Sequence, residues 1–287
     1  MAPSITPIVI DNASQDNTLN QVRSRPGVRL IANQKNLGFA TAVNQGIRST
    51  DAETILLLNP DVELLTPLDA LSAAARQNGL SAGKLLGQDS RAQAGFTIRR
   101  FPTAASLIYE TLGINRLLPS NGVNKAYRYL DRDLDKAGPV DQPAGAFLMI
   151  RRDVWDMLGG LDERFFPIWF EDVDFCKRAA DAGYRAQYVP SVQARHAGAH
   201  SIRQLSSGCR AWYWCVSLLR YAAKHFRSLG YRGLCAAVVL SSVPRMVSRM
   251  IWERSLAPIV EYFKIAWFAG LCLVSSRRRA LVEAAPK

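Results

Sequence analysis

Short runs of apolar residues alternate with amphipathic stretches over the first part of the chain. Residues 7–10, 28–32 and 54–58 are rich in apolar side chains and bounded by polar residues, which is typical of buried strands. Residues 41–49 and 68–77 instead repeat apolar positions at the spacing of an amphipathic helix. Strands that alternate with helices in this way indicate βαβ units, so we predict an α/β fold built on a parallel sheet.

The pattern is interrupted and then resumes further along the chain. Residues 88–139 show no regular period, and we expect a loop-rich segment there. A strand, two helices and a short strand are then predicted, in this order, at residues 145–150, 155–160, 169–182 and 185–189. A loop that holds His196 and His200 is expected to follow the last strand.

A single carboxylate follows the most apolar of these strands. Residues 54–58 read as a fully buried strand that runs into Asn59-Pro60-Asp61, where the proline stops it because it cannot donate to a ladder. Ligands of open α/β sheets bind at the carboxyl ends of the strands, which makes Asp61 a candidate ligand-binding residue. A turn residue is the alternative, because Asp favours turns.

The charge of the chain is concentrated in its last segment. Residues 1–201 carry 22 Lys and Arg against 21 Asp and Glu, while residues 202–287 carry 14 against 3. We therefore predict two domains with these bounds, of which the second, basic one binds an anionic partner. This segment also holds four tryptophans, namely Trp212, Trp214, Trp252 and Trp267.

Both nucleic acid and an anionic membrane surface suit a basic segment rich in tryptophan. The membrane is favoured because apolar runs at residues 234–243 and 265–274 lie between the cations, and because no nucleic-acid-binding motif is present. Each run is shorter than the roughly 18 apolar residues that a spanning helix needs. We expect interfacial or re-entrant helices of an amphipathic tail rather than spanning ones.

The five cysteines indicate the compartment. They form no CxxC pair and are odd in number, as is typical of packed, reduced thiols in a cytoplasmic protein. Residues 1–10 lack the basic and long apolar regions of a secretory signal. The expected location is the cytoplasm, with the tail bound peripherally to the inner face of the cell membrane.

Five segments, taken in order, resemble glycosyltransferase family two, and most of all its rhamnosyltransferase-like members. They are IVIDNASQDNT, NQKNLGFATAVNQGI, ILLLNPDVEL, GAFLMIRRDVW and GGLDERFFPIWFEDVDFCKRAADAGYRAQYVPSVQARH. The resemblance implies the GT-A fold, a Rossmann-like α/β sheet with helices on both faces. It also implies that a sugar, rhamnose or similar, is moved with inversion from a dTDP- or UDP-linked donor to a cell-surface glycan on a lipid carrier.

Three polar residues match positions that contact the nucleotide in this family. Asp11 matches the aspartate that binds the base, and a carboxylate can accept a hydrogen bond from the N3–H of uracil or thymine. Asn36 and Asn44 lie in the part of the pattern that lines the nucleotide. From the residues alone, Asp11 also fits an Asx turn, and either asparagine fits a helix cap or a turn.

The resemblance also implies a divalent metal, Mn2+ or Mg2+. The Asn59-Pro60-Asp61 segment matches the acidic metal-binding motif with Asn in place of the first carboxylate, so Asp61 needs a second protein ligand and the donor diphosphate beside it. His196 matches the family's histidine, and imidazole with oxygen ligands suits Mn2+ at least as well as Mg2+. A structural role is the alternative for His196 and is preferred for His200 and His225.

Three carboxylates, Glu171, Asp172 and Asp174, begin one predicted helix. Acidic residues suit a first helical turn because of the helix dipole, and Asp174 can form an exposed pair with Arg178, so we favour a structural role for Asp174. The resemblance implies that Asp172 is the catalytic base, with Glu171 as the second candidate. Their side chains point about 100° apart on an ideal helix, so only one can face the acceptor squarely.

The remaining candidates are contacts to the acceptor. Gly145 and Ala146 would let an acceptor approach the backbone closely. Trp169, with Phe170, could stack on a sugar, although large apolar residues of this kind more often belong to the core.

One departure from the family pattern concerns the start of the chain. Family members begin with an additional strand and helix before the point that Ile8 matches, and that strand lies between the strands that carry Asp11 and Asn59. Without it, two hydrogen-bond ladders lose their shared neighbour. A truncated, non-catalytic homologue that keeps a membrane-binding tail is therefore the alternative to an active transferase.

Overall fold

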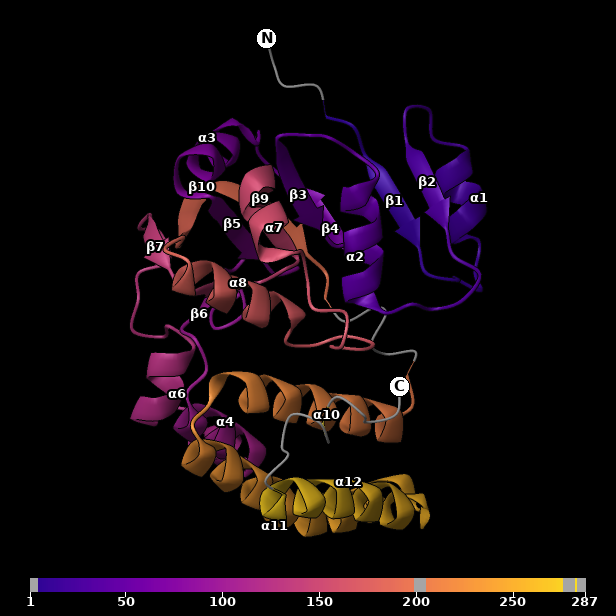
Figure 1. Cartoon of the computed structure of the whole chain (residues 1–287), viewed down its shortest axis with the longest axis vertical. Helices are drawn as coiled ribbons and strands as arrows, with labels where there is room; N and C mark the ends of the chain where they lie inside the picture. The colour runs from indigo at the N-terminus through magenta and orange to yellow at the C-terminus, as the bar shows by residue number, and fades with distance from the viewer. Residues whose placement is uncertain (1–4, 199–204, 276–281, 283–287) are drawn as a thin grey trace. The chain divides into compact units, whose positions relative to one another are not determined.

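The computed structural model describes residues 5–198, 205–275 and 282. The chain divides into two compact units (Figure 1). Unit 1 comprises Met1–Gln93 and Leu134–His196, and unit 2 comprises Ala94–Asp133 and Ala197–Lys287. Residues 94–133 thus group with the tail, whereas the charge pattern placed them in the first domain, because a helix within them packs against a helix of the tail.

A six-stranded sheet forms the centre of unit 1. Its successive strands are β3 (Thr54–Leu58), β9 (Phe147–Arg151), β5 (Leu80–Leu86), β10 (Ala186–His196) and β4 (Val62–Leu64), and β7 (Gly138–Val140) pairs with β10. Of the described pairs in this sheet, β5 with β10 is parallel and the others are antiparallel. The prediction of a parallel sheet is wrong here, because β9 runs between β3 and β5 in the opposite direction.

Helices cover both faces of this sheet. Phe147 and Met149 of β9 pack in a cluster with α3 (Asp69–Asn78). Since alternate strand residues face opposite sides, the buried Leu148 and Ile150 lie on the other face. That face is covered by α7 (Arg152–Leu158) and α8 (Glu171–Asp181), which Figure 1 shows in front of the sheet.

A separate two-stranded sheet holds β1 (Ile8–Asp11) and β2 (Arg29–Ala32), paired in parallel. Within the described chain, β1 has β2 as its sole partner strand, and β3 has β9 as its own. The two strands therefore share no ladder. The other elements of this unit are α1 (Thr18–Arg23), α2 (Phe39–Arg48) and β8 (Gln142–Pro143).

As an edge strand, β3 is less buried than predicted. Ile55 and Leu57 are buried, whereas Leu58 is 40% exposed. The apolar run alone cannot distinguish a central strand from an edge strand, because both present the same residues to the core. The position of Asn59 at the carboxyl end of this strand is as predicted.

The last strand of unit 1 is longer than predicted. Its register with β5 shifts between Val189 and Gln193, after which the strand continues to His196. The end of β10 pairs with β4, so that His196 lies opposite Val62. His196 therefore ends a strand instead of lying in a loop, and the register brings it next to Asp61.

Unit 2 is mainly helical. Its short elements are β6 (Ile98–Arg99), α4 (Ala104–Thr111), α5 (Ile114–Leu117) and α6 (Gly122–Tyr127). These helices have four to eight residues, too few to show a period, which explains why a loop-rich segment was predicted. The long helices are α10 (Ser207–His225), α11 (Ser228–Glu253) and α12 (Ala257–Val274).

Two of the long helices, α11 and α12, run alongside each other (Figure 1). With 26 and 18 residues, both are long and apolar enough to cross a membrane, although a third of each apolar window is buried inside the protein. The prediction from the apolar runs alone underestimated these helices, because α11 continues through Ser, Gly and Arg residues outside its run and α12 begins before its run, through Glu261 and Lys264. Length therefore does not decide between helices that span a membrane and helices that lie on it.

Candidate active site

Asp11 ends β1 with a buried carboxylate. The residue is 3% exposed, and its Oδ2 accepts a hydrogen bond from the backbone N–H of Ser14 at 3.1 Å. This contact reaches three residues on, one further than in the Asx turn that the sequence left open, but it likewise caps the local backbone. Oδ1 is also buried and has no hydrogen-bond partner among the described residues. Because a buried oxygen without a donor is costly, Oδ1 is suited to accept from a ligand N–H.

Asn12, the next residue, holds the loop that follows β2. Its Nδ2 donates to Asn36 Oδ1 and to Gly38 O, each at 3.1 Å, and its Oδ1 accepts from Leu37 N–H at 3.2 Å. Asn36 Oδ1 also accepts from the N–H of Gly38 at 2.9 Å. The Asn36 side chain is thus engaged in its own turn, and it holds this turn beside Asp11.

Asp61 and His196 meet as the pairing of β4 with β10 requires. His196 Nε2 lies 3.5 Å from Asp61 Oδ1, and the imidazole is 5% exposed. Gln93 donates from Nε2 to His196 O at 3.0 Å, which turns its Oε1 toward His196 Nδ1 at 3.1 Å. Because a carbonyl oxygen can only accept, this contact suits the tautomer with the ring proton on Nδ1, in which the Nε2 lone pair faces the Asp61 carboxylate. Two electron-pair donors in this arrangement fit a shared cation.

The segment before β9 links this pair to the acidic helix. Ala146 O accepts from Asn59 N–H at 3.1 Å, and Gly145 N–H donates to Asp172 Oδ2 at 2.9 Å. A Cβ at residue 145 would lie 3.0 Å from Asp172 Cβ. A side chain at residue 145 would therefore crowd Asp172, so this glycine favours the approach of Asp172, whereas the sequence suggested the approach of an acceptor.

Glu171 and Asp172 begin α8 in different surroundings. Glu171 is 4% exposed, and its Oε2 has no hydrogen-bond partner among the described residues. Burial raises the pKa of Glu171 well above its usual range, and the adjacent Asp172 carboxylate raises it further. Asp172 is half-buried and accepts from the backbone N–H groups of Gly145 and Val173. Asp172 is therefore the carboxylate that these donors orient, while burial disfavours the charged form of Glu171.

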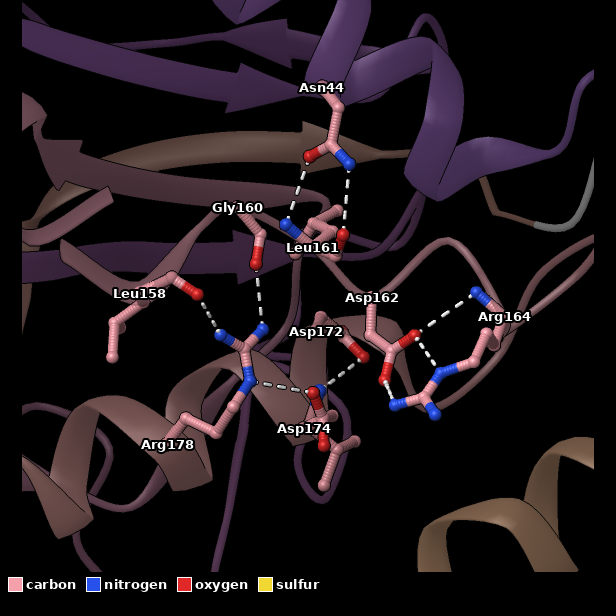
Figure 2. A network of polar contacts seen from close by, with 10 residues as sticks. Asn44, Leu158, Gly160, Leu161, Asp162, Arg164, Asp172, Asp174 and Arg178 are labelled. Carbon is pink, nitrogen blue, oxygen red and sulfur yellow. Dashed lines mark hydrogen bonds and ion pairs between the residues drawn. The ribbon is translucent and has the colours of Figure 1, made fainter. Parts of the chain in front are cut away.

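Asp174 and Arg178 hold the loop that precedes α8. Asp174 is fully buried, and its Oδ2 accepts from Arg178 Nε at 2.9 Å. Arg178 also donates to the carbonyl oxygens of Leu158 at 2.6 Å and Gly160 at 2.7 Å (Figure 2). The prediction of an exposed helical pair is wrong, because the guanidinium turns toward the loop and brings Asp174 into the interior.

Asn44 of α2 holds the same loop from another element. Its side chain donates to Leu161 O and accepts from Leu161 N–H, both at 2.9 Å (Figure 2). Asn44 Nδ2 also donates to Glu163 at 2.8 Å, and this hydrogen bond lowers the pKa of Glu163. The amide is thus committed to the loop, a positioning role that no feature of the sequence suggested.

The loop between α7 and α8 ends in two residues with a left-handed backbone conformation. Trp169 has a φ of 83° and Phe170 a φ of 71°, and both are half-buried, so neither lies in the buried core. Such residues cost about 1–3 kcal/mol each and persist only where the surroundings hold them. Pro167 O, which accepts from Phe39 N–H at 2.8 Å, supplies one such contact. Trp169 consequently remains accessible next to the first turn of α8.

The described hydrogen bonds and ion pairs gather the candidates into three groups. Asp11 lies beside the loop of Asn36, Asp61 beside His196, and Gly145 beside Asp172. His225 packs against Tyr221 in unit 2, with ring centroids 4.6 Å apart and the rings tilted by 41°, and His200 lies outside the described residues. The sequence analysis missed Gln93, Asn12 and the loop contacts of Arg178, all of which act through backbone groups that are distant in sequence.

The arrangement of sheet, helices and acidic strand ends defines a class of enzyme. A mixed sheet covered on both faces, with Asp11 at the end of β1, Asp61 after β3 and acidic residues at the start of α8, is typical of a GT-A glycosyltransferase. A solved structure of GalNAc-T7 with UDP, GalNAc and Mn2+ shares this fold. Its TM-score is 0.51 at 15% identity, over 75% of this chain and 41% of that chain.

Sequence comparison identifies the family. The profiles described as "Glycosyl transferase family 2" and "Glycosyl transferase family group 2" match residues 3–82 and 135–275. The chain is 34% identical to the N-acetylglucosaminyl-diphospho-decaprenol L-rhamnosyltransferase of Mycobacterium tuberculosis (strain ATCC 25618 / H37Rv), over 69% of this chain and 68% of the relative. It is 29% identical to the rhamnosyltransferase WbbL of Escherichia coli (strain K12), over 69% and 72%. The chain therefore belongs to glycosyl transferase family 2, and the predicted family, GT-A fold and enzyme class are confirmed.

Replacing Asp174 should destabilise unit 1 strongly. Asp174→Asn leaves the Arg178 cation without its buried partner, so the free energy of unfolding should fall by about 3 kcal/mol or more. Asp181→Asn is the matched control, because it breaks an exposed pair with Lys177 on the same helix and should cost only a few tenths of a kcal/mol. Urea denaturation measures both values, and equal losses would contradict the anchoring role of Asp174.

The raised pKa of Glu171 should make the protein lose stability as the pH rises. Above its usual value of 4.5, the unfolded chain releases the Glu171 proton while the folded chain retains it, so folding becomes less favourable. Glu171→Gln should remove this loss, leaving stability unchanged near pH 4 and raising it near pH 7. Glu163→Gln should act in the opposite direction, since the pKa of Glu163 is lowered in the fold. Urea denaturation at pH 4 and pH 7 measures these changes. If Glu171→Gln were no more stable than wild type at pH 7, the raised pKa of Glu171 would be refuted.

Proposed function

We propose that the chain is an inverting glycosyltransferase that moves rhamnose or a similar sugar from a nucleoside-diphosphate donor to a lipid-linked glycan. The observation that carries the proposal is the Asp172 carboxylate, which accepts from Gly145 N–H at 2.9 Å beside the segment that holds Asn59. In a single displacement, the base takes the proton of an acceptor hydroxyl, whose oxygen attacks the anomeric carbon as the diphosphate leaves. Asp172 is assigned as this base and Glu171 as a neutral supporting group.

The base of the donor nucleotide is assigned to Asp11. Its buried Oδ1 is free of described hydrogen bonds and suits the N3–H of uracil or thymine, which favours UDP- or dTDP-linked donors. Asn36 shapes the loop that follows β2, and Asn44 of α2 holds the loop at Leu161. Neither asparagine needs to touch the nucleotide for its replacement to disturb the donor site.

A divalent metal, Mn2+ or Mg2+, is assigned to Asp61 and His196. The His196 lone pair and the Asp61 oxygen, 3.5 Å apart, fit a shared cation. The described residues contain no group of three or more Cys, His, Asp and Glu that could hold a metal, so the other ligands would be diphosphate oxygens and water. When bound, the metal would stabilise the negative charge that develops on the leaving diphosphate. The Gln93 carbonyl at Nδ1 favours the histidine tautomer that this role requires.

The acceptor is assigned to the surface around Gly145, Ala146 and Trp169. Trp169 is half-buried beside α8 and offers a ring for stacking on a sugar. The name of the Mycobacterium tuberculosis relative specifies a diphospho-decaprenol acceptor, which supports a lipid-linked acceptor for this chain as well. A peripheral location on the cytoplasmic face of the membrane follows, supported by the basic tail and its exposed apolar residues.

Replacing the base should abolish turnover without affecting donor binding. Asp172→Asn keeps the shape but removes proton acceptance, so turnover should fall by about 10² to 10⁴ while the Kd of the donor changes less than about twofold. Glu171→Gln should cost less. Steady-state transfer assays and calorimetry on the full chain provide the two measurements. If Glu171→Gln abolishes turnover while Asp172→Asn retains it, the base has been assigned to the wrong carboxylate.

Nucleotide binding should depend on a divalent metal held by His196. In calorimetric titrations of UDP or dTDP, His196→Ala should weaken the Mn2+-dependent part of binding by about tenfold or more. His225→Ala, which alters a ring in unit 2, is the control and should leave it unchanged. Equal affinity of the wild-type chain for the nucleotide with Mn2+ and with chelator would overturn the metal assignment.

A further inference from the structure

Apolar side chains occupy two opposite faces of α12. One face is buried and packs with α10 and α11, and it comprises Pro258, Tyr262, Ile265, Ala269 and Cys272. The other face, here called the outer stripe, is between 40% and 77% exposed and comprises Leu256, Val260, Phe263, Trp267, Leu271 and Val274. A surface helix of a globular protein normally carries polar residues on its outer side. The outer stripe is therefore a surface built for an apolar partner.

The outer stripe contains a shallow groove. The rings of Phe263 and Trp267 stack with centroids 6.4 Å apart, and a Cβ at Gly270 would have no heavy atom within 4 Å. The groove of about 410 Å³ is lined by Phe263, Ala266, Trp267, Gly270, Leu271 and Val274. Because none of these side chains is charged, the partner must present hydrocarbon.

The charge of the described tail favours an anionic partner. Residues 205–275 carry nine Lys and Arg but two Glu. Both glutamates, Glu253 and Glu261, form ion pairs with Arg249. Most of the cations are therefore not balanced by acidic residues of the same segment. This excess attracts lipid phosphates, and it opposes the approach of the same surface of a second copy.

Charged groups near the start of α12 favour a helix that lies on the membrane. Arg249 Nη1 donates to Glu261 at 2.6 Å, and the Lys264 ammonium lies 4.0 Å from the centroid of the Trp212 ring. A spanning α12 would bring these charges toward hydrocarbon, whereas a helix in the interface leaves them at the level of the headgroups.

We propose that the outer stripe of α12 inserts at the boundary between the headgroups and acyl chains of an anionic membrane, with the helix axis along the surface. Lipid hydrocarbon then fills the groove around Gly270. The inference rests on the membrane location under the proposed function, and it narrows that location to one helix face.

Binding of the full chain to vesicles tests the proposal. With equal parts of phosphatidylcholine and phosphatidylglycerol, Phe263→Ser/Trp267→Ser should lower the partition coefficient at least about tenfold, because two aromatic side chains leave the interface. The matched control is Leu117→Ser/Leu118→Ser, which alters side chains that are 79% and 61% exposed outside α12 and should change partition less than about twofold. Equal effects of the two double variants would overturn the proposal.

A conservative variant excludes misfolding as the cause. Phe263→Leu/Trp267→Leu keeps the stripe apolar, so it should retain partition within about threefold. Loss of partition in this variant as severe as in the serine variant would also overturn the proposal. Sedimentation velocity without vesicles adds a further test, because a wild-type dimer that the serine variant abolishes, with unchanged vesicle binding, would assign the stripe to a second copy.

Transfer to a water-soluble acceptor separates this inference from the proposed function. The serine variant should retain wild-type transfer in the absence of vesicles, since the stripe contributes no catalytic group. If the wild-type chain showed no transfer while the difference in vesicle binding held, the proposed function would fail and the docking surface would stand. If transfer were normal and neither chain bound anionic vesicles, the docking surface alone would fail.

Discussion

The buried ion pair of Asp174 and Arg178 is the constraint on which the candidate active site depends. Burying a carboxylate is unfavourable unless a cation and further hydrogen bonds compensate, and here the compensation also fixes the chain at Leu158 and Gly160. The loop between α7 and α8 is thereby held against the first turn of α8. Asp172 lies two residues before Asp174 in the same helical turn. The ion pair that fixes this turn therefore also fixes the position of the candidate base.

Two neighbouring carboxylates acquire different properties from this helix start. Glu171 Oε2 is buried without a described hydrogen-bond partner, and burial raises the pKa of this carboxyl well above its usual range. Asp172 instead receives the N–H of Gly145, in a place where a side chain at residue 145 would collide with it. The residue order Glu-Asp therefore does not identify the base. The approach of the Gly145 backbone favours Asp172 as the candidate base, because this hydrogen bond stabilises the charged form of its carboxylate.

The sequence predicted those features that depend on local pattern. Strands ending at Asp11 and before Asn59, the acidic start of α8 and the helices on either side of the sheet follow from periodicity and turn residues. The direction of β9 and the extension of β10 to His196 did not follow, because pairing between distant strands leaves no local signal. Gln93 was missed for the same reason: a lone glutamine in an aperiodic segment acquires its role only from the strand end that it meets.

The charge boundary near Ser201 also gave an incomplete account of the tail. Gly230 and Gly233 of α11 approach Ala104 and Ile108 of α4 closely, as a Cβ on either glycine would meet these side chains at 2.9 Å and 3.3 Å.

Arg245, further along α11, donates to Thr111 O at 2.8 Å. The helix α11 of the basic tail thus packs against residues 94–133. In sequence, these residues lie between the two parts of unit 1. Cutting the chain at Ser201 would expose the α4 face that α11 covers, so catalysis and membrane contact must be studied on the whole chain. The charge pattern marks the basic tail, but packing decides which residues form a folding unit with it.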